Sequence, residues 1–150
     1  AEQREVVEEI ERRVLLVDLD AQANATSGLG VDRRSVERSS YDALVDRAPL
    51  PELVMGTPVE GLDLLPSSPS LSGAEVELVG LAGRERRLAA SLAELKEAYG
   101  MAMIFITHDL ALVTRLCTRA VIFDGGAVTA DGTTRDILDD SALLLRHGLA

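Results

Sequence analysis

Three continuous apolar runs constrain the fold of this 150-residue chain more than any other feature. Val14–Val17 consists of valine and leucine without alternating polar residues, and Met101–Ile106 and Ala120–Phe123 are similar. Such runs are typical of strands buried on both faces of a parallel sheet. Helical patterns separate the runs, most clearly over Arg84–Tyr99. We therefore predict an α/β fold, with a three-layer, mostly parallel sheet and helices on both faces.

Shorter elements are predicted between and after these runs. Asp124-Gly125-Gly126 is a hairpin signal, Ala127–Ala130 follows as the returning strand, and Asp131-Gly132 suggests a second turn. Residues 21–40 are predicted to be loop with a short helix. The other predicted elements are a strand at Gly61–Leu65 and helices at residues 2–12, Tyr41–Arg47, Leu50–Met55, Ser72–Val79, Leu110–Cys117, Thr133–Asp139 and Ser141–Arg146. The chain is thus expected to form a single α/β domain over residues 1–150, with a C-terminal β-hairpin.

The charge balance excludes some partners. The chain carries 15 basic and 25 acidic residues, a formal net charge of −10. Non-specific binding to nucleic acid or anionic membranes needs clustered Lys and Arg, so we expect no direct nucleic-acid binding. No apolar run approaches the roughly 20 residues that span a bilayer, so no membrane insertion is expected. The acidic N-terminal segment does not resemble a signal peptide, and we predict a cytoplasmic protein.

The first two thirds of the chain resemble a known family of ATPases. The segment Val14–Gly30 (VLLVDLDAQANATSGLG) resembles the ParA/Soj/MinD partitioning and positioning ATPases, although that family usually has Pro where this chain has Ala21. The resemblance covers about residues 14–99 and includes Tyr41–Val45, Gly61–Ser68 and Leu71–Leu81. It implies a P-loop-NTPase-like sheet, with ATP and Mg²⁺ as cofactors.

The remaining residues resemble a second family. Met103–Leu110 (MIFITHDL) is similar to the switch-histidine segment of ABC transporter ATP-binding subunits. Arg119–Gly132 and Asp136–Leu149 are similar to the segments after the switch histidine in those subunits, especially in importers of the cobalt or energy-coupling type. We therefore interpret residues 1–99 as a ParA-like part and residues 100–150 as an ABC-ATPase-like part. A recombined or designed chimera explains this pattern best, with a natural fusion as the alternative.

The central motifs of both families are missing from the sequence. The phosphate-binding loop GxxxxGK[ST] does not occur, and Lys96, the only lysine, lies within the predicted helix Arg84–Tyr99. The Walker B acidic pair and the ABC signature LSGGQ do not occur either. Since ATP hydrolysis needs the phosphates to be held, the sequence leaves open whether the chain is an enzyme.

Two aspartates follow the first buried strand. Asp18 and Asp20 are two residues apart, so we expect their side chains to leave the same face. The ParA resemblance implies Mg²⁺ placement for both and a catalytic, water-activating role for Asp20. The alternative is a merely solvated pair at a strand end. With His108 and Asp124, which also follow predicted strands, they are expected to gather at one rim of the sheet, where α/β proteins bind ligands.

His108 is the second candidate catalytic residue. The ABC resemblance implies that it senses the γ-phosphate, and an imidazole can donate a hydrogen bond to an anion. The alternative is a histidine that bonds to Thr107 or Asp109, or caps the next helix. Asp109 is predicted to cap the helix that begins at Leu110. We expect His147 to be exposed.

Three further residues complete the candidate assignments. Thr26 and Ser27 are candidate nucleotide-binding residues, through hydroxyl or backbone N–H groups, and an ordinary loop is the alternative. Cys117 is expected to pack in the core.

Three functions remain open from the sequence. The first is a P-loop-NTPase-like domain with residual ATP and Mg²⁺ binding and little or no hydrolysis. The second is a chimeric or designed scaffold without a ligand. The third is a fragment of an ATP-binding subunit whose P-loop lies outside these residues. Nucleotide is the expected partner, and both resemblances suggest a homodimer.

Overall fold

The structure is a computed structural model that describes residues 13–46, 48–72, 89–90, 92–93, 96–97 and 100–149. The predicted helix at residues 2–12 lies outside the described residues, and so does Ser72–Val79 beyond its first residue. Within Arg84–Tyr99, the described residues 89–90, 92–93 and 96–97 are helical. No helix in the described ranges has the length and apolarity needed to span a membrane.

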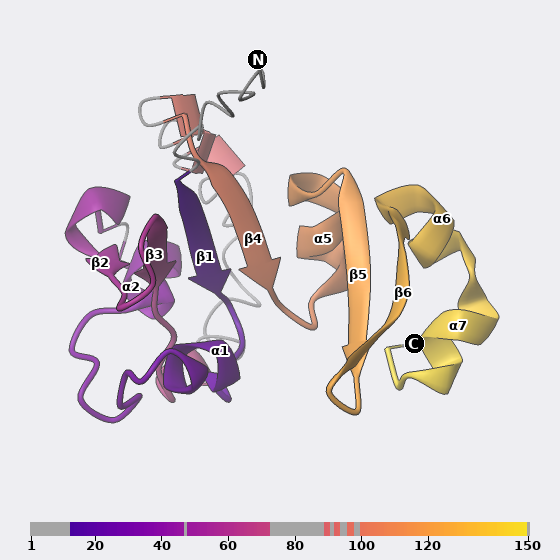
Figure 1. Cartoon of the computed structure of the whole chain (residues 1–150), viewed down its shortest axis with the longest axis horizontal. Coiled ribbons are helices and arrows are strands. Elements are labelled where there is room, and N and C mark those ends of the chain that lie inside the picture. Colours follow the sequence, from indigo (N-terminus) through magenta and orange to yellow (C-terminus); the bar gives the residue numbers. More distant parts are fainter. Residues whose placement is uncertain are drawn as a thin grey trace, which may run out of the picture.

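A four-stranded, mostly parallel sheet forms the first half of the fold (Figure 1). Its order is β2 (Met55–Gly56), β3 (Leu62–Leu65), β1 (Val14–Asp18) and β4 (Ala102–Ile106). β1 is parallel to both β3 and β4, whereas β2 is antiparallel to β3. The predicted α/β class with a mostly parallel sheet is confirmed.

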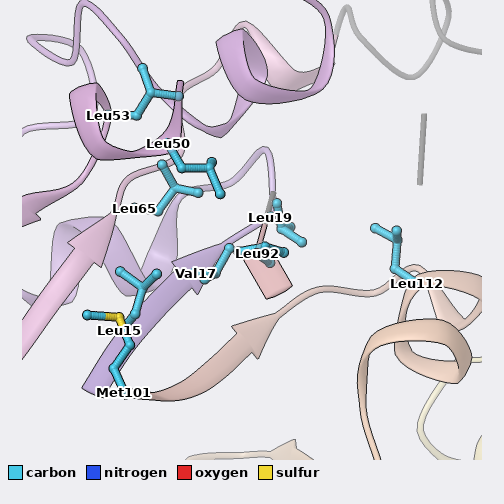
Figure 2. Packing of buried hydrophobic residues seen from close by; sticks show 9 residues of the cluster. All are labelled: Leu15, Val17, Leu19, Leu50, Leu53, Leu65, Leu92, Met101 and Leu112. Carbon is cyan, nitrogen blue, oxygen red and sulfur yellow. The ribbon is translucent and has the colours of Figure 1, made fainter. Parts of the chain in front are cut away.

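β1 lies at the centre of the main core. Leu15 and Val17 are completely buried, and their side chains pack with Leu65 of β3 and Leu92 (Figure 2). A strand with neighbours on both edges and apolar contacts needs an uninterrupted apolar sequence. The prediction of a buried first strand is therefore confirmed. The complete set of buried residues in this cluster is Leu15, Val17, Leu19, Leu50, Leu53, Leu65, Leu92, Met101 and Leu112.

The helices are short, and side chains cap several of them. They are α1 (Asn24–Gly28), α2 (Ser40–Leu44), the 3₁₀ helix η1 (Leu50–Glu52), α5 (Leu110–Leu116), α6 (Thr134–Asp139) and α7 (Ser141–Arg146). The Thr133 hydroxyl accepts from the Asp136 N–H at the start of α6, and the Asp140 side chain accepts from the Leu143 N–H at the start of α7. The predicted helix Leu50–Met55 is wrong beyond Glu52, because Met55 pairs with Leu64 in β2.

The C-terminal hairpin forms a sheet of its own. β5 (Arg119–Asp124) and β6 (Ala127–Thr133) pair antiparallel, and their turn contains Gly125 and Gly126 at φ 59° and 81°. Positive φ at both central residues is what a tight type I′ hairpin turn requires, so the predicted hairpin is confirmed. The second predicted turn, Asp131-Gly132, is wrong because both residues pair with β5 inside β6.

The hairpin is covered on one face only. Ile122 of β5 is buried and packs with Ile137 of α6 and Leu144 of α7. On the opposite face, Val121 is 49% exposed and Phe123 is 70% exposed. The prediction that Ala120–Phe123 is buried on both faces is therefore wrong. The physical reason is that β5, in the part of the chain that the structure describes, pairs with β6 and with no strand of the parallel sheet.

β4 departs from its prediction in the same way. Met103 and Phe105 pack against the main core, but Ile104 is 51% exposed and Ile106 is 37% exposed. β4 is an edge strand of the described sheet, with β1 as its hydrogen-bonded neighbour. The strand at Met101–Ile106 is thus confirmed, and its burial on both faces is not.

An ion pair across the hairpin gives a prediction about pH. The Arg119 guanidinium donates to both carboxylate oxygens of Asp131 at 2.7 and 2.6 Å, and this hydrogen bonding holds the pKa of Asp131 below its usual 3.8. A lowered pKa means stability that is present above about pH 4 and is lost as pH falls through the folded-state value. We expect an NMR titration of the Asp131 carboxyl to have its midpoint below 3.8, and Arg119→Gln to move it back toward 3.8. An unchanged midpoint in the variant would contradict this assignment.

Candidate functional site

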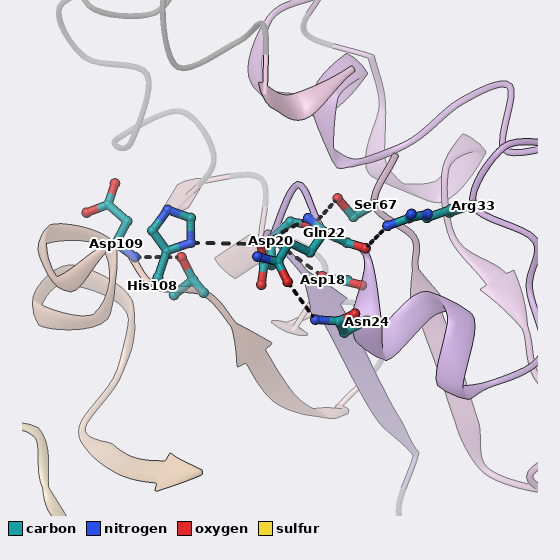
Figure 3. A network of polar contacts seen from close by, with 9 residues as sticks. Asp18, Asp20, Gln22, Asn24, Arg33, Ser67, His108 and Asp109 are labelled. Atoms are coloured by element: carbon teal, nitrogen blue, oxygen red, sulfur yellow. Dashed lines mark hydrogen bonds and ion pairs between the residues drawn. The ribbon is translucent and has the colours of Figure 1, made fainter. Parts of the chain in front are cut away.

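Two of the predicted site residues meet at the carboxyl ends of β1 and β4. The strands run parallel and in register up to the pair Asp18 and Ile106, so the residues that follow them emerge side by side. Nδ1 of His108 lies 3.9 Å from Oδ1 of Asp20, with side chains 59% and 24% exposed (Figure 3). The rim predicted from the strand ends thus brings a carboxylate and an imidazole together where solvent reaches both.

Asp18 faces the interior instead. Its side chain is completely buried, and Oδ2 accepts hydrogen bonds from the Thr26 N–H at 2.9 Å and the Thr26 hydroxyl at 2.7 Å. Oδ1 accepts from the Asp20 N–H at 3.2 Å. The alternative of a merely solvated pair is therefore wrong for Asp18. Its carboxylate already accepts three hydrogen bonds inside the protein, and its complete burial keeps it away from solvent.

Thr26 is part of the same buried network. Besides donating to Asp18, its hydroxyl accepts from the Ser67 N–H at 2.9 Å, and the Ser67 hydroxyl donates to the Asp20 carbonyl at 2.7 Å. The network thus links the end of β3 to the segment that carries Asp20. Because Thr26 is fully buried, its donors are occupied within the protein. Ser27 is exposed, and its N–H donates to the Ala23 carbonyl at 3.0 Å.

The turn after Asp20 is tight and strained. The Ala23 N–H donates to the Asp20 carbonyl at 2.9 Å, and Oδ1 of Asp20 accepts from the Gln22 N–H at 3.0 Å. Ala23 has φ 53°, the left-handed region that costs a non-glycine residue about 1–2 kcal/mol. Strained backbone of this kind persists where surrounding contacts enforce it, often at functional sites. The turn therefore gives the Asp20 carboxylate a fixed direction.

Sequence reasoning missed two residues beside this turn. Ser67 follows β3 at the same edge of the sheet as Asp18. Its place after a strand could have identified it as a candidate, whereas a serine alone gives no such signal. Nη1 of Arg33 donates to the Gln22 carbonyl at 2.6 Å, which places a cation next to the turn (Figure 3). Arg33 is eleven residues from Gln22 in the sequence, and no helix or strand period connects positions so far apart.

Asp109 has the capping role that the sequence predicts. Its carboxylate accepts from the N–H groups of Ala111 and Leu112 at 2.8 and 3.2 Å, and its own N–H donates to the Thr107 hydroxyl at 3.1 Å. The alternative in which His108 caps α5 is therefore wrong. The cap instead fixes the backbone on the carboxyl side of His108.

Asp124 does not join the rim. Its Oδ2 lies 2.8 Å from Nδ1 of His147, whose side chain is only 9% exposed. The predictions that Asp124 lies with Asp18 and Asp20 and that His147 is exposed are both wrong. Asp124 belongs to the separate hairpin sheet, and the chain after α7 folds back onto the hairpin tip (Figure 1). Cys117 is partly buried, and this burial raises the pKa of its thiol, in keeping with a packing role.

The site offers a divalent cation little protein coordination. Among the described residues, no group of three or more His, Cys, Asp or Glu could hold a metal ion. Mg²⁺ commonly binds through one or two carboxylates, with water and phosphate oxygens supplying the other ligands. Asp20, partly exposed and held by its turn, fits one such ligand.

Comparisons with known proteins point to one family. A family profile described as "AAA domain" matches residues 5–120. The sporulation initiation inhibitor protein Soj of Bacillus subtilis is 46% identical over 105 residues, covering 70% of this chain and 42% of Soj. The chromosome partitioning protein ParA of Myxococcus xanthus is 42% identical over 104 residues, covering 69% of this chain and 37% of ParA.

A solved structure agrees with these relatives. The cobyrinic acid a,c-diamide synthase of Mycobacterium smegmatis, solved with a bound ATP analog and magnesium, has a TM-score of 0.60 and 37% identity. The match covers 69% of this chain and 42% of that one. The chain thus spans about two fifths of the length of these relatives. The profile continues past residue 99, the predicted end of the ParA-like part, and ends within β5.

Proposed function

This chain belongs to the AAA domain family and has a P-loop-NTPase-like fold of the ParA/Soj type, and on that basis we propose that it binds Mg²⁺-nucleotide weakly at the Asp20–His108 rim. We further propose little or no hydrolysis by these residues alone. GxxxxGK[ST], the sequence that usually holds the β- and γ-phosphates, does not occur in the chain.

The observation that carries this proposal is the 3.9 Å approach of His108 Nδ1 to Asp20 Oδ1. A carboxylate suits a cation and an imidazole N–H suits an anion, so the two groups match the two parts of a Mg²⁺-phosphate ligand. A bound Mg²⁺ would supply positive charge beside the phosphates. Asp20 would orient the ion's water ligands, and His108 would donate a hydrogen bond to a phosphate oxygen.

We assign Asp18 and Thr26 an indirect part in this site. Their mutual hydrogen bonds are buried, so we propose that they hold the turn carrying Asp20 and do not touch the ligand. Ser27 is exposed one residue later and stays a candidate for contact with nucleotide. The ATP analog and magnesium in the structure of the M. smegmatis synthase support nucleotide as the ligand class.

Binding of a fluorescent ATP analogue, with and without Mg²⁺, tests the proposal. We expect weak binding that needs Mg²⁺, and Asp20→Asn should weaken it about tenfold, equivalent to about 1.4 kcal/mol. Asparagine keeps an oxygen that can accept from the Gln22 N–H, so the turn should survive. His108→Ala should also weaken binding, because it removes the proposed phosphate donor.

A matched variant controls for charge. Asp139→Asn removes one carboxylate from α6, where the Asp139 side chain is 74% exposed and pairs with Arg135. It should leave binding unchanged. Unchanged affinity in both Asp20→Asn and His108→Ala would place any nucleotide site elsewhere. An absence of binding at about millimolar nucleotide would overturn the proposal and favour the scaffold without a ligand.

A second candidate is that these residues are part of a longer ATPase. The chain spans 42% of Soj, which favours a P-loop outside the 150 residues. The gene sequence around this segment tests it, because a strand followed by GKGGVGKT-like residues would identify the missing loop. A cytoplasmic location and a nucleotide-bridged homodimer are proposed on the same ground, from the family.

We also infer a separate, ABC-like origin for the C-terminal part, which the sequence assigned to residues 100–150 and which the family match to residue 120 limits to about the last 30 residues. The family profile ends at residue 120, and the β5–β6 hairpin pairs with no strand of the first sheet. A genome that encodes the profile-matching segment and the hairpin segment in two different genes would support a fusion. Full-length ParA-type relatives that carry the same hairpin segment after β4 would contradict it.

A further inference from the structure

One peptide plane in the turn after Asp20, the plane between Gln22 and Ala23, is held from two sides. Its N–H, on Ala23, donates to the Asp20 carbonyl at 2.9 Å. Its carbonyl, on Gln22, accepts from Nη1 of Arg33 at 2.6 Å (Figure 3). The N–H and the C=O of a trans peptide lie in one plane and point in opposite directions, so the two hydrogen bonds fix the orientation of this plane. We call this pair of hydrogen bonds the Arg33 clamp.

The Arg33 clamp acts on the strained part of the turn. Ala23 is completely buried and has φ 53° and ψ 40°. While α1 stays in place, a relaxed, negative φ at Ala23 would require the peptide plane before it to rotate. This rotation would take the Gln22 carbonyl away from Arg33 and the Ala23 N–H away from Asp20. The Arg33 clamp therefore opposes relaxation of the turn.

The loop that carries Arg33 is itself ordered. Oδ1 of Asp32 accepts from the Arg34 N–H at 3.0 Å, which closes a turn around Arg33. The Val31 N–H donates to the Thr26 carbonyl at 3.2 Å, which attaches the loop to α1. Neither contact uses the guanidinium of Arg33. The loop should therefore keep its conformation when this guanidinium is removed.

From this arrangement we propose that Arg33 is a positioning residue for Asp20. Oδ1 of Asp20 accepts from the Gln22 N–H at 3.0 Å, so the direction of the carboxylate depends on where Gln22 lies. A guanidinium is always charged, and a charged donor makes a stronger hydrogen bond to a carbonyl than a neutral donor does. The inference rests on the proposed binding of Mg²⁺-nucleotide at Asp20 and His108. Arg33 acts on that binding through the backbone and contacts neither the ion nor the phosphates.

Amide hydrogen exchange without nucleotide tests the clamp itself. Arg33→Met removes the guanidinium and keeps an unbranched apolar side chain, and we expect the Ala23 N–H to exchange about tenfold faster. The Val17 N–H in β1 should keep its rate, because the effect is local. Arg33→Lys should restore most of the protection, since an ammonium can also donate to the Gln22 carbonyl. An unchanged rate at Ala23 in Arg33→Met, or an equal change at Val17, would overturn the clamp.

Arg34→Met provides the matched control. Arg34 is the adjacent residue and is also exposed, but the hydrogen bond to the Gln22 carbonyl comes from Arg33. The control therefore removes the same charge from the same loop and leaves the clamp in place. Exchange of the Ala23 N–H should match that of the parent chain. An acceleration equal to that in Arg33→Met would show that charge alone protects the turn, and it would overturn the proposal.

A double-mutant cycle, with a fluorescent ATP analogue and Mg²⁺, tests whether Arg33 acts through Asp20. Arg33→Met should weaken binding about fivefold, whereas Arg34→Met should leave it unchanged. In the Asp20→Asn background, Arg33→Met should have no further effect, because the carboxylate that it positions is gone. Additive losses would overturn the positioning role and indicate a direct contact between Arg33 and the phosphates.

The two measurements separate the positioning role from the proposed function. If the parent chain bound no nucleotide, the proposed function and the part of Arg33 in it would both be wrong. The exchange rate of the Ala23 N–H would still show whether the Arg33 clamp holds the turn. If the parent chain bound nucleotide and Arg33→Met bound it equally well, the proposed function would stand and the positioning role would be wrong.

Discussion

Replacing Asp18 with alanine is expected to lower the free energy of unfolding by about 3 kcal/mol, although this residue lies beside the candidate site and is polar. The substitution leaves the Thr26 N–H and hydroxyl buried without their acceptor. Each buried donor that loses its partner costs about 1–3 kcal/mol, and the absence of a buried charge offsets part of this loss. Urea denaturation followed by circular dichroism would measure the change.

A double-mutant cycle separates the network from a general loss of packing. Thr26→Val keeps the shape but removes the hydroxyl that bridges Asp18 and the Ser67 N–H, so we expect a loss of about 2 kcal/mol. The double variant should lose at least about 1 kcal/mol less stability than the two single variants together, because both substitutions break the same hydrogen bond between Asp18 and Thr26. Thr114→Val, an exposed position on α5, should cost about 0.5 kcal/mol or less. Additive losses at Asp18 and Thr26 would contradict the network.

The contrast between Asp18 and Asp20 shows where sequence reasoning about the site ends. Parallel strands place their carboxyl ends at one rim, and this rule correctly brought Asp20 and His108 together. Which of two neighbouring carboxylates points outward depends on the turn after the strand. Here the hydroxyl of Thr26, eight residues later, donates a hydrogen bond to Asp18 and holds its carboxylate in the interior. No local pattern predicts such a contact, because the fold creates it.

The same limit explains the errors in burial. An uninterrupted apolar run predicts a strand, and all three predicted runs contain one. Burial, however, depends on which elements cover each face, and that is a property of topology. Among the described strands, β1 has a neighbour on each side, whereas β4 has one neighbour and β5 pairs with β6 alone. His147 is a similar case, since it follows the last helix of the chain but its side chain lies against Asp124 at the hairpin tip.

A second large loss of stability is expected at a buried position of the sheet, and a small loss at an exposed position. Leu15→Ala removes a completely buried side chain from the main core, and Leu→Ala changes at such sites cost about 3–4 kcal/mol. Ile104→Ala, on the exposed face of β4, should cost about 1 kcal/mol or less, because its side chain is 51% exposed. Urea denaturation at low protein concentration would keep both measurements on the monomer.

The comparison bears on the fold as well as on stability. If Ile104→Ala cost as much as Leu15→Ala, β4 would be covered on both faces by the chain itself, which would contradict the exposure of Ile104.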